Sequence, residues 1–366
     1  MAKYKRQKVK RYRRSFYSRG TRIKKGIGIV VLVLAVLGAA WLAAPHVLDW
    51  ATHTWYTVVK NRDLEAESAS RAAASSEAAA SSAVQEAASS QPEPEQPKEL
   101  DGKAITGGSW AAVDVSTLAD DAAIRAAAQQ LKAQGADYGL VTLKDADGSI
   151  HYASQVAAAS GSIAGTTVDP ARIAAIFREE GIIPAAQLAV FTDPVSGYTD
   201  RSMAVHYSGT QLWLDNVSAK AGGKSWLDPS AASAVQYVGD LIDELHGMGF
   251  EQVVLTGVQF PNIITRKQEF AAAGGKSQEG RAALLAADIS TWQARFDGSV
   301  VLWLSYPAQQ CTDASDALGA PAVSLGMHNL IVTADTLDAA ARGQLQQSAA
   351  EAGVQNVVIC STESFQ

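Results

Sequence analysis

The strongest constraint on the fold is a regular alternation of short apolar segments and longer helical segments, beginning near residue 107. Seven segments rich in β-branched and aromatic residues are predicted to be strands: 110–115, 138–143, 182–191, 252–258, 300–306, 329–334 and 355–360. Five segments between them have helical periodicity: 121–134, 170–180, 229–248, 281–296 and 337–352. Nearly continuous apolar strands that alternate with helices indicate a parallel sheet covered by helices.

This pattern predicts an α/β fold in which residues 107–366 form one TIM-type (β/α) barrel. Because seven strands can be recognised rather than eight, the barrel is either shortened at its C-terminus or contains an irregular eighth strand, with 322–325 as the candidate. The alternative is an open, doubly wound sheet. In either fold, the loops that follow the carboxyl ends of the strands form the functional face.

An uncharged apolar segment, Gly26–Ala44, follows an arm with twelve Lys and Arg and no acidic residue in positions 1–25. Its 19 residues reach roughly 28 Å as a helix, close to the thickness of a bilayer core. We therefore predict a single transmembrane helix at 26–46, with a basic cytoplasmic arm at 1–25 and the C-terminal domain outside the bacterial cell membrane. The alternative is a cleaved signal peptide, whose apolar region is usually shorter.

Residues 47–106 are predicted to form a juxtamembrane helix and then a stalk rich in Ala, Ser, Glu and Pro, with too little apolar bulk for a core. Outside the arm, 19 basic residues remain against 37 acidic ones, a net charge of −18. Such an exterior repels phosphate backbones, so no nucleic-acid partner is expected there. Binding of RNA or a cytoplasmic protein by the arm is the alternative to a role in topology.

The long loop after the third predicted strand combines aromatic and acidic side chains. Aromatic planes beside carboxylates often hold polyols by stacking and charge-assisted hydrogen bonds. The ligand-binding candidates are therefore this loop's residues and three positions at later strand ends: Trp213, Asp215, Trp226, Asp228, Gln259, Trp303 and Tyr306. Asp228 before Pro229 is equally typical of a helix N-cap, and the two tryptophans could equally form the core of a lid.

Five short motifs follow one another in the first half of the predicted barrel. They are 141–148 with 150–154, 189–194, the Trp213/Asp215–Asn216 pair, 225–229, and 249–251 running into 258–261. In this order they resemble a bacterial glycosyl hydrolase family of unknown function, the DUF4015 type, which is a TIM-barrel relative of glycoside hydrolases. The resemblance covers roughly residues 108–262 and implies a glycosidase-like barrel that acts on or binds glycan.

The chain departs from that family where the family carries charge. The family typically has an acidic residue in the second strand, where this chain has Thr142. In the fourth strand it reads approximately Asp-Tyr-Val-Arg-Phe-Pro, whereas residues 256–261 read Thr-Gly-Val-Gln-Phe-Pro. Glycoside hydrolysis generally needs two carboxylates, and threonine does not ionise. The resemblance thus implies a barrel frame without its usual acid pair.

Other acids lie at predicted strand ends or on the long loop. The catalytic candidates are Asp114, Asp145, Asp193 and Asp215, any two of which would suffice if they lay about 5–10 Å apart. The competing interpretation of each is a turn or a helix cap. No metal and no cofactor are expected, because the six histidines are scattered. Cys311 and Cys360 either form a disulfide or are two buried free thiols.

Together these features favour a membrane-anchored, extracytoplasmic, glycoside-hydrolase-like domain that binds cell-wall polysaccharide or an envelope partner without catalysis. The alternative is an active glycoside hydrolase with relocated carboxylates. A third hypothesis is a structural envelope protein whose arm contacts a cytoplasmic partner.

Overall fold

The computed structural model describes residues 108–362 and residue 365. The predicted basic arm, membrane span and stalk lie outside these described residues. Among the helices of the described part, none is both long enough and apolar enough to cross a membrane.

The described chain alternates strands and helices throughout. The strands are β1 Trp110–Val113, β2 Tyr138–Lys144, β3 Ile150–Tyr152, β4 Ile163–Val168, β5 Ile183–Ala189, β6 His206–Tyr207, β7 Gln211–Leu212, β8 Gln252–Thr256, β9 Val301–Pro307, β10 Asn329–Thr333 and β11 Asn356–Cys360. The α-helices are α3 Asp121–Ala133, α4 Pro170–Glu179, α5 Ser196–Thr199, α6 Ala232–Gly247, α7 Gln278–Arg295, α8 Ala308–Thr312 and α9 Ala339–Glu351.

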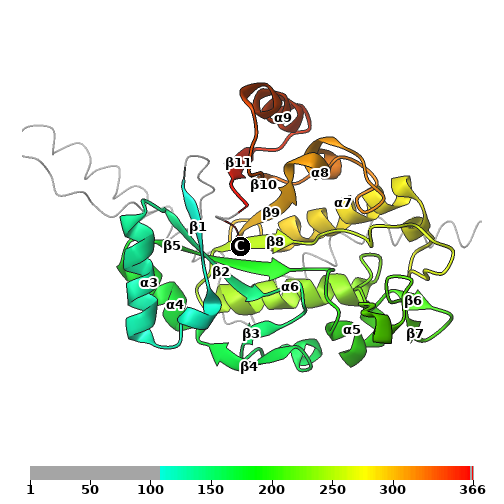
Figure 1. Ribbon diagram of the computed structural model, residues 1–366, viewed down its shortest axis with the longest axis horizontal. Helices are drawn as coiled ribbons and strands as arrows, with labels where there is room; N and C mark the ends of the chain where they lie inside the picture. Colours follow the sequence, from blue (N-terminus) through cyan, green and yellow to red (C-terminus); the bar gives the residue numbers. More distant parts are fainter. Residues whose placement is uncertain (1–107, 363–364, 366) are drawn as a thin grey trace, which may run out of the picture. The chain divides into compact units, whose positions relative to one another are not determined.

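The seven predicted strands are all present and pair in parallel in the order of the sequence, β1-β2-β5-β8-β9-β10-β11 (Figure 1). Short β3 and β4 extend the sheet from the end of β2, where β3 runs antiparallel to it. A sheet whose neighbours follow the chain order is typical of the TIM barrel, whereas a doubly wound sheet reverses its order at a switch point. The alternative of a doubly wound sheet is therefore wrong.

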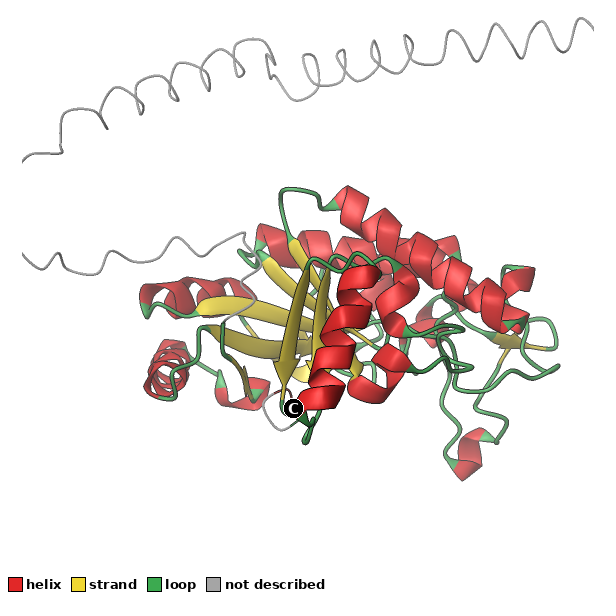
Figure 2. Cartoon of the chain, turned by 90° about the horizontal axis from the view of Figure 1, so that it is seen from above, coloured by secondary structure: helices red, strands yellow, loops and turns green. Residues whose placement is uncertain are grey.

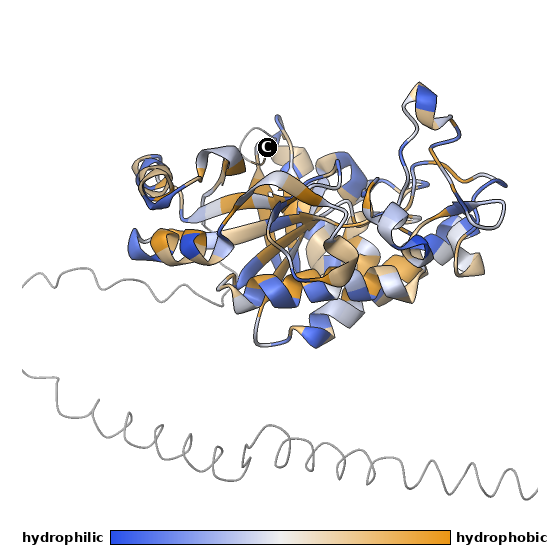
Figure 3. Ribbon diagram, turned by 90° about the horizontal axis from the view of Figure 1, so that it is seen from below, coloured by the Kyte–Doolittle hydropathy of each residue, from blue (hydrophilic) through white to orange (hydrophobic). Residues whose placement is uncertain are grey.

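The core consists of two separate apolar clusters, one on each face of the sheet. The outer cluster joins the strands to the helices, which surround the strands in Figure 2 and carry both hydrophilic and hydrophobic residues in Figure 3. The inner cluster holds residues from the seven parallel strands and Phe365, and none from a described helix. Because β1 and β11 both contribute to this inner cluster, the sheet is curved around it as in a barrel.

Aromatic rings fill the inside of the curved sheet. Trp110 of β1 stacks on Tyr138 at 4.0 Å between ring centroids and meets the ring of Trp303 edge-on at 5.4 Å. Phe365, just beyond β11, lies 6.2 Å from Trp110. Among the described residues β1 pairs only with β2, and β11 pairs only with β10. Side-chain packing therefore connects the first and last strands.

The candidate eighth strand is wrong. Residues Ala322–Leu325 form a 3-10 helix, η7, which starts after Pro321 and ends at Gly326 in the left-handed region, at φ 80°. Ala322, Val323 and Leu325 are buried in the outer cluster. Their apolar character therefore reflects packing against helices rather than a place in the sheet.

The two cysteines are free and buried, so a disulfide is not formed. Cys311 on α8 belongs to the outer cluster and Cys360 on β11 to the inner one, which places the two thiols on opposite faces of the sheet. Burial raises the pKa of Cys311 to about 12 and that of Cys360 to about 11. Both side chains remain protonated packing groups at neutral pH.

Candidate functional site

A layer of uncharged polar side chains lies at the carboxyl end of the sheet interior. On each strand, the residue two positions earlier belongs to the inner apolar cluster, and side chains alternate along a strand. The layer therefore faces inward directly above that cluster. Its members are Thr142 on β2, Gln187 on β5, Thr256 on β8, Ser305 on β9 and Thr333 on β10.

A cavity of about 340 Å³ opens above this layer, and we call it the strand-end pocket. Its lining consists of hydroxyl and amide side chains with a few apolar ones. The former are Gln187, Thr256, Gln259, Ser305, Gln310, Thr333 and Thr362, and the others are Gly257, Tyr306, Pro307 and Phe365. Among these described lining residues there is no carboxylate and no cation, so the pocket is polar but uncharged.

The two positions where the family resemblance implies acids both face this interior. Thr142 lies on β2 and Thr256 on β8, the two strands that flank β5, and Thr142 is directly opposite Gln187 in the register. The third changed position, Gly257, has a φ of 62°, and a side chain there would collide with Thr192 at 2.4 Å. Acids at positions 142 and 256 would therefore face the sheet interior, and a side chain at position 257 would be strained.

Asp193, a catalytic candidate, is an internal structural group. Its carboxylate is fully buried and lies 2.8 Å from Nζ of Lys144, itself 2% exposed, and it accepts hydrogen bonds from the backbone of Val195 and Ser196. Burial alone would raise the pKa of Asp193, but Lys144 and the hydrogen bonds outweigh burial and hold it below its usual value. A fully enclosed carboxylate of this kind does not reach a ligand.

Asp114 and Asp145 are partly used by the local backbone. Asp114 accepts from the backbone N–H of Ser116 and caps the short 3-10 helix η2, Val115–Thr117, and these bonds lower its pKa. Asp145 accepts from two backbone N–H groups of its turn with one oxygen and lies 3.0 Å from Nε2 of His151 with the other. His151 makes a smaller electrostatic contribution to the low pKa of Asp114.

Three candidates on the long loop form hydrogen bonds within that loop. Asp215 accepts from Nε1 of Trp226 at 2.6 Å and from the backbone of Lys224 at 3.3 Å. Trp213 is 2% exposed and donates to Asn216. Asp215 and Asn216 both have positive φ, at 50° and 61°. The tryptophans therefore hold the loop's own fold, as the lid interpretation predicted.

Asp228 is not the predicted helix cap. Helix α6 starts at Ala232, and its N-cap Ala231 makes no side-chain hydrogen bond. Asp228 is 1% exposed and instead accepts from Ser230 and, across the chain, from the backbone of Ala271 at 2.7 Å. The Asp-Pro pair marks a connection between two loops because its carboxylate turns inward.

The remaining candidates divide between the pocket and the core. Gln259 lines the strand-end pocket and donates to Asn262. Tyr306 also lines it, but its hydroxyl donates to the carbonyl of Val258, and the side chain is 2% exposed. Trp303 lies wholly inside the sheet and donates to Gln252. Of the predicted ligand-binding residues, the structure brings only Gln259 and Tyr306 to the pocket.

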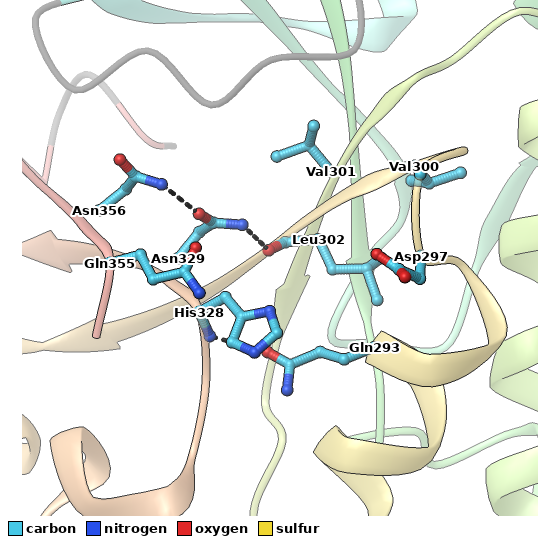
Figure 4. A pocket seen from close by; sticks show the side chains of 10 residues that line it. Gln293, Asp297, Val300, Val301, Leu302, His328, Asn329, Gln355 and Asn356 are labelled. Atoms are coloured by element: carbon cyan, nitrogen blue, oxygen red, sulfur yellow. Dashed lines mark hydrogen bonds between the residues drawn. The ribbon is translucent and has the colours of Figure 1, made fainter. Parts of the chain in front are cut away.

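Sequence reasoning missed most of the pocket. Gln187, Thr256, Ser305 and Thr333 are the polar residues in otherwise apolar strand segments, and this break in the pattern was the available signal. A second cavity, of about 470 Å³, lies at the amino ends of β9, β10 and β11, and Figure 4 shows its amide side chains, with Asn356 donating to Asn329. It occupies the face that in TIM barrels serves stability rather than function.

The fold and the pocket define an α/β barrel whose strand-end pocket has no acid among its described lining residues. The family model described as "Putative glycosyl hydrolase domain" (DUF4015) matches residues 113–301, which is more than half of the chain. The chain belongs to this family. The match extends beyond the short motifs, through α7 to the first residue of β9.

Several solved structures are similar in part. A hypothetical protein from Ruminiclostridium thermocellum matches 53% of this chain and 96% of its own at 21% identity and a TM-score of 0.45. The α-galactosidase from Thermus thermophilus matches 67% of this chain at 13% identity and a TM-score of 0.40. The GH20 exo-β-N-acetylglucosaminidase from Vibrio harveyi matches 70% of this chain at 8% identity and a TM-score of 0.47. This chain covers 46% and 42% of those two glycosidases. No curated protein matches in sequence.

Proposed function

We propose that this protein is a membrane-anchored, extracytoplasmic domain that binds cell-envelope glycan in the strand-end pocket and does not hydrolyse it. The observation that carries the proposal is the uncharged lining of the pocket. Hydroxyl and amide groups form hydrogen bonds with sugar hydroxyls, whereas hydrolysis by the usual route needs one carboxylic acid and one carboxylate across the scissile bond.

The fate of the candidate acids supports this proposal. Asp193 is enclosed with Lys144, and Asp215 is engaged by Trp226. Residues 142 and 256, where the family resemblance implies acids, are threonines that face the interior. A glycosidase frame that keeps the pocket and loses the acids is suited to holding a glycan.

The sequence outside the described residues supports the location. The apolar segment 26–46 after a basic arm predicts a span with its N-terminus inside, and the stalk 47–106 predicts separation of the domain from the bilayer. Cell-wall polysaccharide is the ligand class available on that side of a bacterial membrane.

The test uses the full chain in detergent, sedimented with isolated cell-wall polysaccharide. We expect binding without release of reducing ends. The double variant Thr256→Val and Thr333→Val should bind at least about fivefold more weakly, since two hydrogen bonds worth about 0.5–1.5 kcal/mol each are removed. The matched control Thr210→Val changes an exposed threonine outside the pocket. No binding by the wild type, or equal loss in the control, would overturn the proposal.

A second candidate function, glycoside hydrolysis with relocated acids, is favoured by one observation. His151 lies within hydrogen-bond distance of Asp145 and helps to lower the pKa of Asp114, so it interacts with two of the four candidate carboxylates. If this function holds, wall polysaccharide or aryl-glycosides release product, and Asp145→Asn or Asp114→Asn abolishes the release. Turnover that survives both variants would exclude this acid pair.

A further inference from the structure

We infer that the strand-end pocket selects an uncharged sugar unit and that Gln187 is the residue that recognises it. This inference rests on the proposed function, and it adds the class of ligand and the group that reads it.

Gln187 carries an unused hydrogen-bond acceptor in the pocket wall. Its Oε1 atom is buried and has no partner among the described residues. The side chain faces the sheet interior from the middle strand of the Thr142–Gln187–Thr256 trio. A buried polar atom without a partner costs about 1–3 kcal/mol and needs an explanation. Gln187 lines the pocket, so rotating its side-chain amide toward the cavity would bring Oε1 to a ligand hydroxyl or amide N–H that supplies the missing donor.

The groups around Gln187 are suited to the same kind of ligand. Ser305 and Thr333 line the pocket, and their hydroxyls make no hydrogen bond within the described part of the protein. The hydroxyl of Thr256 has only a long contact of 3.5 Å with the carbonyl of Leu188. Hydroxyls both donate and accept, so they match the hydroxyl groups of a sugar ring in either direction.

Charge excludes acidic sugars from this pocket. A carboxylate or phosphate would lose hydration there without meeting a cation among the described lining residues, and burying an unpaired charge is very costly. The buried cations near this end of the sheet are already used. Lys144 is paired with Asp193, and Arg281 donates to the backbone carbonyls of Pro261 and Asp316.

The pocket's size limits the ligand. Its volume of about 340 Å³ is at the lower end of the range for small-molecule sites. The aromatic cluster of Trp110 and Trp303 closes the interior one layer below the polar side chains. The pocket therefore accommodates a single sugar unit, such as the end of a chain, rather than a long segment.

The first experiment measures competition for the full chain in detergent bound to cell-wall polysaccharide. The competitors are cellotetraose and its fully C6-oxidised counterpart, tetraglucuronate, which share linkage and stereochemistry and differ in charge. We expect cellotetraose to displace the polysaccharide at a concentration at least tenfold lower. Equal competition by both, or competition by neither while the polysaccharide still binds, would overturn this inference and leave the proposed function standing. Absence of polysaccharide binding would overturn both.

The second experiment replaces Gln187, the residue that we infer recognises the sugar. Gln187→Leu should weaken cellotetraose competition about fivefold to tenfold, the worth of one hydrogen bond. Its thermal stability should stay equal or rise, because an unpaired buried polar group is replaced by an apolar one. Gln187→Glu should weaken it further by adding charge. The control Gln347→Leu changes an exposed residue of α9 outside the pocket, whose side chain donates to Glu351. If cellotetraose displaced the polysaccharide from Gln187→Leu as well as from the wild type, Gln187 would not be the residue that recognises the sugar.

Discussion

Two buried ionic groups show how single residues constrain this protein. Lys144 and Asp193 form an ion pair that is almost completely enclosed, and both also hydrogen-bond to the chain. Removal of one partner leaves an uncompensated charge, which typically costs about 3–5 kcal/mol. We expect Lys144→Met to lower the free energy of unfolding by this order of magnitude in denaturant titrations. The control Arg125→Met removes the pairs of a 43% exposed arginine with Glu179 and Glu180 and should cost less than about 1 kcal/mol per pair. Similar costs would contradict the burial argument.

Asp288 on α7 makes stability depend on pH. Its Oδ2 atom is buried without a partner in the described chain, and burial, aided by Asp228, raises the pKa of Asp288 to about 8. Between about pH 4 and pH 8 the folded protein keeps a proton that the unfolded chain releases, so stability falls as pH rises through that window.

Asp288→Asn should therefore raise the Tm by a few degrees at pH 8 and change it little at pH 4. Calorimetry at the two pH values provides the measurement. Asp297→Asn, at an exposed acid, is the control and should have no such difference. A gain that is the same at both pH values would rule out titration of Asp288 as the cause.

At the scale of elements, local pattern was sufficient for the frame. The seven parallel strands and the five long helices follow from apolar runs and helical periodicity. Caps such as Asp169 before Pro170, which accepts from two backbone N–H groups, fix helix starts from local chemistry alone. Asp228 before Pro229 has the same local pattern and a different outcome, because Ala271, far along the chain, supplies a donor.

The site was less predictable than the frame for the same reason. Period-two alternation places Gln187 inside the sheet, but its lack of a partner depends on which side chains fail to reach it from other strands. The prediction of a strand at 322–325 was wrong for a related reason, since apolar residues pack against helices as readily as in a sheet. Pairwise contacts across the fold are not encoded in any short segment.

Phe365 contributes a single ring to the inner apolar cluster beside β1. It is 6% exposed, packs near Trp110 and lines the strand-end pocket. Phe365→Ala should lower the free energy of unfolding by about 3–5 kcal/mol and alter tryptophan fluorescence. The control Tyr198→Ala, at a ring that is 54% exposed, should cost less than about 0.5 kcal/mol. An unchanged stability in Phe365→Ala would show that this ring does not support β1.

At the scale of the whole molecule, we predict that the N-terminal region determines where the protein is located. Deletion of residues 26–46 should move the protein from the membrane fraction to the soluble fraction, because those residues contain the uncharged apolar segment. Fractionation with alkaline extraction measures this. Deletion of residues 70–90, an equally long piece of the predicted stalk, should leave the protein membrane-bound. Membrane retention after the first deletion would contradict the predicted anchor.

The connection between β1 and β11 has a mechanical consequence. All neighbouring parallel strands share backbone hydrogen bonds, whereas these two are joined, in the described residues, through the rings of Trp110 and Phe365. The barrel is therefore held together more weakly between β1 and β11, and Phe365 at this junction also lines the pocket. Widening the pocket at this position would separate the rings of Trp110 and Phe365 without breaking backbone hydrogen bonds between strands. We therefore expect this side of the barrel to move more easily than the strands opposite. A ligand that widens the pocket should accordingly disturb the contact between Trp110 and Phe365 before any strand pairing.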